Sequence, residues 1–385
     1  MERLALSIKN TNKILALGPE SDGNFSLYVN GELDYYSGYG DLLADNNIVN
    51  FKKELLHVLR KNNPDIILTD FHPLFKTTVL GQELAEKFKA QLIKVQHHHA
   101  HIFASVIDKL VEDNRQPKEF IAIAADGTGL GLDEQIWGGE VFQGKINLPS
   151  LKLRQAGNFQ STIKRVGSLE PQVMIGGDLA IKEPARMLLS LLLKKDHPST
   201  RLRMKSFFSP QELNVLAKQY QQNFNCQLTT SAGRILDAVS VLLGFANNQR
   251  EYKHQPIELL AKNSTQPYEL EPRIEFDQEK DRYLISTSYL FDCLLKNLDQ
   301  DKSRLAATAQ LYLAQGFWQV ISNCHPEPSR RRQLPLFFSG GLAKNKIMSE
   351  FLKNKGVYLN QKIPCGDAGI SIGQIGYYLL ANPRD

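Results

Sequence analysis

The stretch of sequence that most constrains the fold is VQHHHAHI, residues 95–102, which follows the strand-like run Gln91–Val95. In a helix, His97 and His101 are one turn apart, so both imidazoles lie on the same face. Such a pair can supply two ligands of one metal ion. Because two histidines do not complete a metal site, the hypothesis requires carboxylates from elsewhere in the chain. The alternative is that these histidines decorate a helix surface or satisfy hydrogen bonds in the core.

Two aspartates in glycine-rich loops are the candidates for the remaining ligands. Asp126 follows the apolar run Glu119–Ala125 and begins the loop DGTGLG, so a carboxylate and backbone amides point to the same place. Asp367 lies in PCGDAGISIG, residues 364–373, at the start of a helix of small residues. The alternative for Asp126 is a hairpin turn, and for Asp367 it is ordinary helix capping. We expect both aspartates to join the two histidines in one metal site.

A third glycine-rich loop, SGGLAKN at residues 339–345, follows the strand-like run Leu336–Phe338. Glycines directly after a strand let the backbone approach a ligand, and the next helix presents free N–H groups and a positive dipole end. This pattern suits a phosphate or a nucleotide, but a tight turn without a ligand has the same pattern. In SAGRILDAVSVLLG, residues 231–244, Gly233 and Asp237 lie one turn apart at a helix start. There Asp237 either accepts from ribose hydroxyls or complements the helix dipole.

Composition and charge restrict the class of protein. The chain has 385 residues, 42% of them apolar, which is enough for two domains or one two-lobed unit. The 46 basic and 41 acidic residues give a net charge of +5, which does not by itself indicate nucleic-acid binding. The four cysteines have no CxxC spacing, so neither a zinc ribbon nor a disulfide framework is predicted. No export signal is recognised and no apolar run approaches the roughly 18 residues of a membrane span, so we expect a cytoplasmic protein.

Strands and helices alternate along the chain, which predicts an α/β fold with mixed sheets. Three runs, Ile14–Leu17, Asn24–Val29 and Glu32–Tyr36, predict a meander that opens a first sheet. A second sheet is predicted to start at Glu119–Ala125 and to include Leu151–Gln155. The repeated order of strand, strand and glycine turn suggests two related lobes.

The chain resembles the C-terminal carbamoyltransferase domain of the HypF family, which matures nickel–iron hydrogenases. DFHPLFKTT, WGGE and EPARM are the motifs that point to HypF. The histidine block and both aspartate loops are shared with a wider class that includes TsaD-like tRNA threonylcarbamoyl transferases and antibiotic O-carbamoyltransferases. The blocks that carry the resemblance span nearly the whole sequence: ALG (16–18), GDL (40–42), DFHPLFKTT (70–78), VQHHHAH (95–101), DGTGLG (126–131), IWGGE (136–140), GGDLAIKEPARM (176–187), TSAGRILDAVSVLLG (230–244), SGGLAKN (339–345) and PCGDAGISIGQ (364–374).

The resemblance implies a two-lobed actin/Hsp70/sugar-kinase-like (ASKHA) α/β fold, with duplicated mixed sheets flanked by helices. It implies an N-terminal lobe over residues 1–118 that carries the histidine helix and is completed by residues 366–385. The C-terminal lobe, residues 119–365, would carry the nucleotide-binding loops. An ion of iron or zinc would be held between the lobes by four ligands: His97, His101, Asp126 and Asp367.

The resemblance also implies a nucleotide site and candidate catalytic residues. A carbamoyl-adenylate, a nucleotide of the ATP/AMP type, would be held by Gly127, Thr128, Gly129, Gly233, Asp237, Gly340, Gly341 and Asn345. His72 and His98 are the candidate catalytic residues, and His98 or His99 would help to deprotonate the acceptor. For His98 and His99 the alternative is surface decoration.

In the family, the carbamoyl group passes to the C-terminal cysteine thiol of HypE. We therefore expect a metal-dependent carbamoyltransferase with a HypE-like acceptor and with neither a membrane nor a nucleic-acid partner. The acylphosphatase-like, zinc-finger and YrdC-like parts of full-length HypF are not recognised here. Either a separate YrdC-like or HypF N-terminal protein supplies the adenylate, or the chain is a standalone relative with another acceptor. The alternatives are an O-carbamoyltransferase or tRNA threonylcarbamoyl-type transferase, and a degenerate nucleotide-binding scaffold subunit.

Two places depart from the family's pattern. The first loop has Asp22-Gly23-Asn24 where the family usually has Lys-Asn-Thr, which removes a cation and a hydroxyl from a place that would face phosphate or metal. This loop is the main support for the scaffold alternative. The block YKHQPIELLA, residues 252–261, keeps Tyr252 and Glu258 but has His254-Gln255-Pro256 in place of Gly-Gln-Ala. These changes bear on the substrate more than on the fold.

Overall fold

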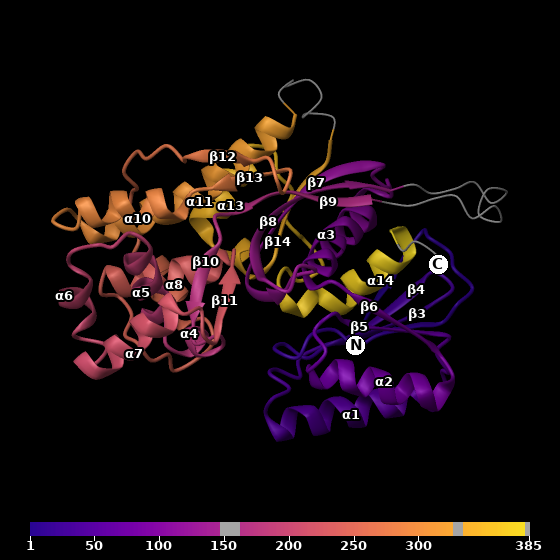
Figure 1. Cartoon of the computed structure of the whole chain (residues 1–385). Helices are drawn as coiled ribbons and strands as arrows, with labels where there is room; N and C mark the ends of the chain where they lie inside the picture. Colours follow the sequence, from indigo (N-terminus) through magenta and orange to yellow (C-terminus); the bar gives the residue numbers. More distant parts are fainter. Residues whose placement is uncertain (147–161, 326–333, 382–385) are drawn as a thin grey trace.

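Two mixed β-sheets, with helices packed against them, make up the protein (Figure 1). The structure is a computed structural model that describes residues 1–146, 162–325 and 334–381. The strand predicted at Leu151–Gln155 lies outside the described residues. The predicted α/β architecture with two mixed sheets is confirmed. Within the described ranges, no helix combines the length and apolar character that a bilayer crossing requires.

The first sheet has six strands in the order β1-β4-β3-β2-β5-β6, and it begins with the predicted antiparallel meander. The strands β2, β5 and β6 are parallel, so their carboxyl ends meet at one edge. That edge carries the loop after β2, the loop after β5 and the start of the histidine helix. The strands are β1 (Glu2–Ala5), β2 (Ile14–Ala16), β3 (Phe25–Val29), β4 (Glu32–Tyr36), β5 (Ile66–Asp70) and β6 (Gln91–Val95).

Alternate residues of this sheet face two different cores, because side chains in a strand alternate between faces. Leu15 and Ile67 pack with the helices α1 (Asp45–Leu59) and α2 (Lys76–Phe88) on one face. Ile14 and Leu68 face the other way, toward α3 (His97–Asp113) and α14 (Ile370–Leu380).

The second sheet is larger and carries two glycine-rich segments, the one that begins at Asp126 and the one at residues 339–345. Its path is β10-β11-β8-β9-β13-β12, and β7 joins it by pairing with both β8 and β14. The parallel pairing of Ser339 with Ala124 places the loop after β14 beside Asp126. The strands are β7 (Glu119–Leu130), β8 (Ile136–Lys145), β9 (Thr162–Leu169), β10 (Gln172–Ile175), β11 (Cys226–Thr229), β12 (Ile274–Asp277), β13 (Arg282–Ile285) and β14 (Leu336–Ser339).

The strand expected to end at Asp126 is longer than the sequence suggested. β7 continues to Leu130, but its pairing with β8 is interrupted between Ala125 and Gly129. Asp126 therefore lies in a strand irregularity rather than in a loop after the strand, because interrupted pairing frees the backbone there and redirects the side chain.

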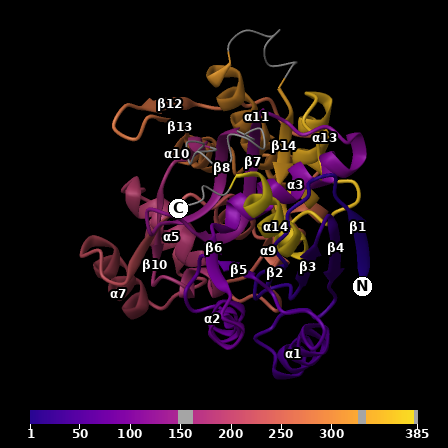
Figure 2. The same cartoon turned by 90° about the vertical axis from the view of Figure 1, so that its right-hand side faces the viewer.

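Helices α3 and α14 lie between the two sheets, as Figures 1 and 2 show from perpendicular directions. A Cβ atom added to Gly373 of α14 would lie 1.8 Å from the carbonyl oxygen of Ala100 in α3, so glycine permits the close approach of the two helices. The predicted lobe boundaries at residues 118 and 365 stay predictions. The remaining α-helices are α4 (Leu179–Lys182), α5 (Ala185–Lys194), α6 (Thr200–Met204), α7 (Pro210–Gln221), α8 (Ala232–Leu242), α9 (Gln255–Lys262), α10 (Thr287–Lys296), α11 (Lys302–Cys324) and α13 (Lys346–Asn354).

Candidate metal and nucleotide site

The structure brings the four predicted metal ligands together. His97 and His101 lie in the first turns of α3, Asp126 lies in β7, and Asp367 begins the 3-10 turn Asp367–Gly369 before α14. One candidate ligand atom from each residue lies within 4.8 Å of the other three. The Nε2 atom of His97 is 3.4 Å from Asp126 Oδ2 and 3.5 Å from Asp367 Oδ1. The corresponding distances from Nε2 of His101 are 3.4 Å and 3.6 Å.

These separations fit a divalent ion. Four ligands placed roughly 2.0–2.1 Å from a tetrahedral ion lie about 3.4 Å from one another. Both histidine Nε2 atoms and Asp367 Oδ1 are buried and have no hydrogen-bond partner among the described residues. Buried polar atoms without a partner are costly, so their convergence on one point indicates a missing ligand.

Charge interactions inside the cluster are strong. Burial opposes a charge on His97, but the carboxylates of Asp70, Asp126 and Asp367 outweigh it and raise the pKa of His97 well above its usual value. Burial also opposes a charge on Asp126, but His101 and His97 hold its pKa well below the usual range. Lys253 and His97 likewise lower the pKa of Asp367 despite its burial. An ion that bound here would therefore have to displace a proton from His97.

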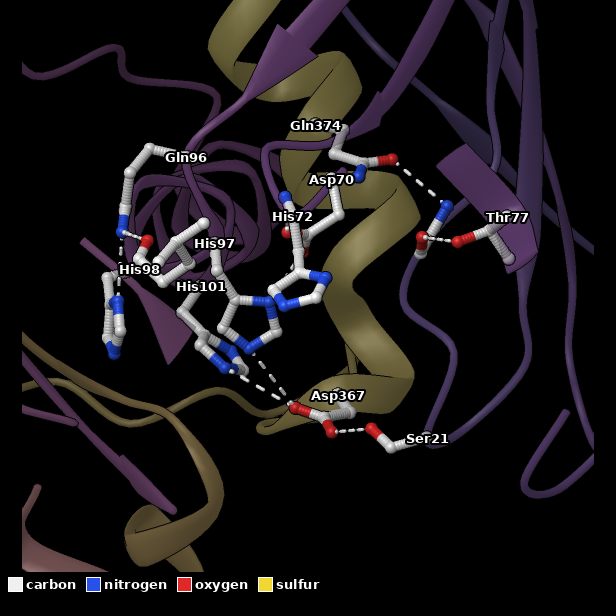
Figure 3. Close-up of polar contacts among 12 residues, drawn as sticks. Ser21, Asp70, His72, Thr77, Gln96, His97, His98, His101, Asp367 and Gln374 are labelled. Atoms are coloured by element: carbon white, nitrogen blue, oxygen red, sulfur yellow. Dashed lines mark hydrogen bonds and ion pairs between the residues drawn. The ribbon is translucent and has the colours of Figure 1, made fainter. Parts of the chain in front are cut away.

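Asp70 holds His97 from the side opposite the other carboxylates. Its Oδ2 atom lies 2.7 Å from Nδ1 of His97, and its Oδ1 atom accepts a hydrogen bond from the backbone N–H of His72 (Figure 3). Such a contact orients a ligand histidine. The ring of His72 stacks on Phe75 with a centroid distance of 4.3 Å. The catalytic role predicted for His72 stays a prediction.

The hydrogen bonds of Gln96 fix the orientation of His98. The side-chain oxygen of Gln96 accepts from the backbone N–H of His99, so its amide nitrogen is the group that lies 3.1 Å from His98 Nδ1. Because Nδ1 accepts this bond, His98 is neutral and carries its proton on Nε2. Burial and the neighbouring histidines also lower the pKa of His98. Its predicted catalytic role stays a prediction.

Surface decoration, the alternative interpretation of the histidine block, is wrong. All four histidines of the block are buried: His97, His98, His99 and His101. The reason is that α3 lies between the two sheets, so the first turns of the helix have no solvent-facing side.

A cavity of about 250 Å³ adjoins the metal cluster, with Asp126 and Asp367 in its wall. Three of the predicted nucleotide-binding residues line it, namely Gly127, Gly341 and Asn345. The backbone N–H of Gly341 also donates to Asp126 Oδ1 at 3.1 Å, which links the predicted nucleotide loop to a predicted metal ligand.

The other predicted nucleotide-binding residues are Thr128, Gly129, Gly233, Asp237 and Gly340, and they lie outside the lining of this cavity. A Cβ atom on Gly233 would lie 2.8 Å from Gly127 Cα, and one on Gly340 would lie 2.2 Å from the oxygen of Ala125. These two glycines therefore permit close backbone packing. The nucleotide role of all five residues stays a prediction.

Asp237 has partners that its sequence position did not indicate. It is fully buried, and its Oδ2 atom lies 2.7 Å from both Arg234 and Arg250. An ion pair with two arginines is a structural role. Whether Asp237 also contacts a ribose stays a prediction.

Sequence reasoning missed several charged residues of the cavity wall. Lys253, His254, Glu258 and Lys344 line it together with Asp22 of the first loop. Residues 22–24 and 252–261, which contain Asp22, Lys253, His254 and Glu258, depart from the family pattern. This departure was the signal in the sequence that could have pointed to them. Burial and the charge of Asp367 raise the pKa of Asp22.

Comparisons with known proteins show the family to which the chain belongs. Residues 122–374 match the family described as "Carbamoyltransferase, Kae1-like Domain, second subdomain", and residues 9–108 match the "HypF Kae1-like domain". The chain is 33% identical to the probable carbamoyltransferase HypF of Methanocaldococcus jannaschii, over 99% of this chain and 48% of that protein. It is 28% identical to the carbamoyltransferase HypF homolog of Cupriavidus necator, over 79% of this chain and 75% of that protein.

Two solved structures share the fold. Full-length HypF in its phosphate- and nucleotide-bound form has a TM-score of 0.83 and 24% identity, over 98% of this chain and 47% of that one. HypF of T. kodakarensis has a TM-score of 0.79 and 26% identity, over 98% and 48%. The chain spans about half the length of both structures and of the Methanocaldococcus relative. The fold class predicted from the sequence is confirmed.

Proposed function

Because the chain belongs to the HypF carbamoyltransferase family, we propose that it moves the carbamoyl group of carbamoyl-adenylate to the C-terminal cysteine of a HypE-like protein. The observation that carries the proposal is the convergence of two histidines with two aspartates, both of which line a cavity that also has Gly127, Gly341 and Asn345 in its wall. In this role the chain would serve the maturation of a nickel–iron hydrogenase. A separate YrdC-like or HypF N-terminal protein would supply the adenylate.

We propose that His97, His101, Asp126 and Asp367 hold iron or zinc. Two imidazoles and two carboxylates form a donor set that suits either ion. When bound, the ion would polarise the transferred carbonyl group or the phosphate oxygens. Asp70 would orient His97 so that its Nε2 lone pair faces the ion.

The cavity residues would hold the nucleotide. The glycines at positions 127 and 341 let the backbone approach it closely. Asn345 is the N-cap of α13, where its side chain accepts from the N–H of Met348 at 3.1 Å, and this bond fixes the start of the helix. Glu258 accepts a hydrogen bond from Tyr252 at 2.7 Å and has a second oxygen for ribose hydroxyls.

The transfer needs no nucleophile from this chain. The acceptor thiol loses its proton and its sulfur bonds to the carbamoyl carbon, while the bond from that carbon to the phosphate oxygen breaks and releases AMP. Cys365 is the cysteine that lies two residues from a metal ligand. Burial raises the pKa of its thiol, so at neutral pH it stays protonated and is a poor nucleophile.

The proposal is tested by mixing the metal-loaded chain with carbamoyl-adenylate and a HypE-like protein and weighing the C-terminal peptide of that protein. We expect the mass of one carbamoyl group on the cysteine, and none when this cysteine is replaced by serine or when the chain carries Asp126→Asn. Carbamoylation of a small hydroxyl compound or of a tRNA adenosine in place of the thiol would refute the acceptor. Binding of metal and nucleotide without transfer to any of these acceptors would favour the scaffold alternative.

A further inference from the structure

Asp367 faces two different groups at the end of the cavity. Its Oδ1 atom faces the Nε2 atoms of His97 and His101, and its Oδ2 atom lies 3.0 Å from Nζ of Lys253. Lys344 lines the same cavity. Two lysines therefore adjoin the metal cluster, although neither belongs to its ligand set.

Lys253 has capacity beyond its ion pair. Its side chain is 44% exposed, and an ammonium group has three N–H donors, of which Asp367 takes one. Lys344 has no ion-pair partner within the described part of the chain.

The charges at this end of the cavity suit an anion only when the lysines are counted. Asp22, Asp126, Glu258 and Asp367 are the four carboxylates of the cavity wall, and a divalent ion with neutral histidines would cancel two of their charges. The remaining negative charge would repel a phosphate at close range. Lys253 and Lys344 cancel this remainder and provide N–H donors for the phosphate oxygens.

We infer that Lys253, assisted by Lys344, forms a subsite for the phosphate group of a nucleoside monophosphate beside the metal ligands. The inference rests on the proposed function and names the residues that bind the anionic part of the substrate. Lys253 immediately precedes the turn that starts α9, and Glu258 lies on the first turn of that helix. One short segment thus offers a cation to the phosphate and a carboxylate to the neighbouring ribose.

The experiment compares the affinities of AMP and adenosine by calorimetry on the zinc-loaded chain. We expect Lys253→Met to weaken AMP binding about tenfold or more, as the loss of one charge-assisted hydrogen bond predicts, and to leave adenosine binding within about twofold. Lys262→Met is the matched control, since Lys262 is an exposed lysine at the end of α9, the helix that follows Lys253. It should change neither affinity.

A second variant tests the charge balance itself. In the Lys253→Met background, Asp22→Asn removes one negative charge, so AMP affinity should recover by about threefold or more. The inference is overturned if Lys253→Met weakens AMP and adenosine equally, if it weakens neither, or if Asp22→Asn gives no recovery. If the unsubstituted chain binds neither AMP nor adenosine, the proposed use of a nucleotide fails instead. The adenosine affinity also reports whether each variant is folded.

Discussion

Asp70 Oδ2 lies 2.7 Å from Nδ1 of His97, and both side chains are buried. Strand register produces this contact, since Asp70 ends β5 and pairs with Val95 at the end of the parallel strand β6, two residues before His97. The other nitrogen of the same ring faces Asp126 and Asp367. A carboxylate in this position fixes the tautomer of a ligand histidine and raises its basicity.

The first prediction is that Asp70→Asn weakens zinc binding by about 10- to 100-fold. The amide oxygen can still accept from the N–H of His72, which leaves the amide nitrogen facing Nδ1 of His97. Because an amide nitrogen only donates, Nδ1 must accept and the ring proton moves to Nε2, the nitrogen proposed to bind the ion, so the loss comes from the wrong tautomer and from the missing charge of Asp70. Competition with a chromogenic chelator measures the affinity. Asp45→Asn, at an exposed position at the start of α1, should have no effect. Equal affinities for the Asp70 and Asp45 variants would show that Asp70 does not support the metal site.

The convergence of His97, His101, Asp126 and Asp367 could be predicted from the sequence because local features single out each of them. His97 and His101 are one helical turn apart, and both aspartates lie beside glycines that leave room for a ligand. The strands β6 and β7, which lead to His97 and to Asp126, are also visible as apolar runs. Agreement between local pattern and global fold is the expected behaviour of a foldable sequence.

Residues that depend on tertiary register were not predictable in this way. The contact of Asp70 requires the pairing of β5 with β6, and the place of Lys253 in the cavity depends on where α9 docks. Asp237 also has a partner that depends on tertiary structure. From the sequence, a carboxylate near a helix start could bind a ligand. In the structure, Asp237 accepts a hydrogen bond from Arg250, which is 13 residues away in sequence.

A second prediction concerns Asp108, which ties the segment before Asp367 to the helix that carries the histidines. Asp108 is fully buried on α3. Its carboxylate accepts four hydrogen bonds, from Tyr358 Oη at 2.6 Å and from the backbone N–H groups of Gln361 at 2.7 Å, Lys362 at 2.9 Å and Ile363 at 2.5 Å. Asp108→Ala leaves these donors without an acceptor, so we expect the free energy of unfolding to fall by about 3 kcal/mol.

Urea unfolding measures this loss, and Asp113→Ala is the control on the same helix. Asp113 is exposed and pairs only with Lys109 among the described residues, so its removal should cost less than about 0.5 kcal/mol. Zinc affinity should fall in the Asp108 variant as well, because Asp367 follows the released segment. A stability loss as small as that of the control would refute this role.

The third prediction tests the close packing of α3 on α14. In Gly373→Ala the new methyl group would meet the backbone oxygen of Ala100, which cannot move without shifting the helix, so we expect a loss of about 2 kcal/mol or more. In Gly376→Ala the nearest atom, at 2.6 Å, belongs to the side chain of Ile107, and the nearest backbone atom, the oxygen of Phe103, is 3.1 Å away, so a smaller shift of the helix is enough. Thermal unfolding should rank the Gly373 variant as the less stable of the two. The reverse order would mean that this helix contact is not tight.

The last prediction concerns acid and the buried ring of His99. This ring contacts Phe142 and Tyr377, and burial lowers the pKa of His99 from 6.5 to about 4. Below pH 6.5, His99 therefore binds a proton in the unfolded chain, whereas in the folded chain it stays neutral until about pH 4. Unfolding thus becomes more favourable as the pH falls through this window, by roughly 1.4 kcal/mol for each pH unit, or about 3 kcal/mol in all.

His99→Phe keeps an aromatic ring between the same neighbours and removes the titration. We expect urea unfolding of the metal-free proteins to give a free-energy difference, wild type minus variant, that is constant above about pH 7 and falls by about 3 kcal/mol on going to pH 4. Because the other titrating groups of the cluster are present in both proteins, their contributions cancel in this difference. Parallel curves over the whole range would show that His99 takes up its proton equally well in the folded chain, and so that its ring is not shielded from water as the structure requires.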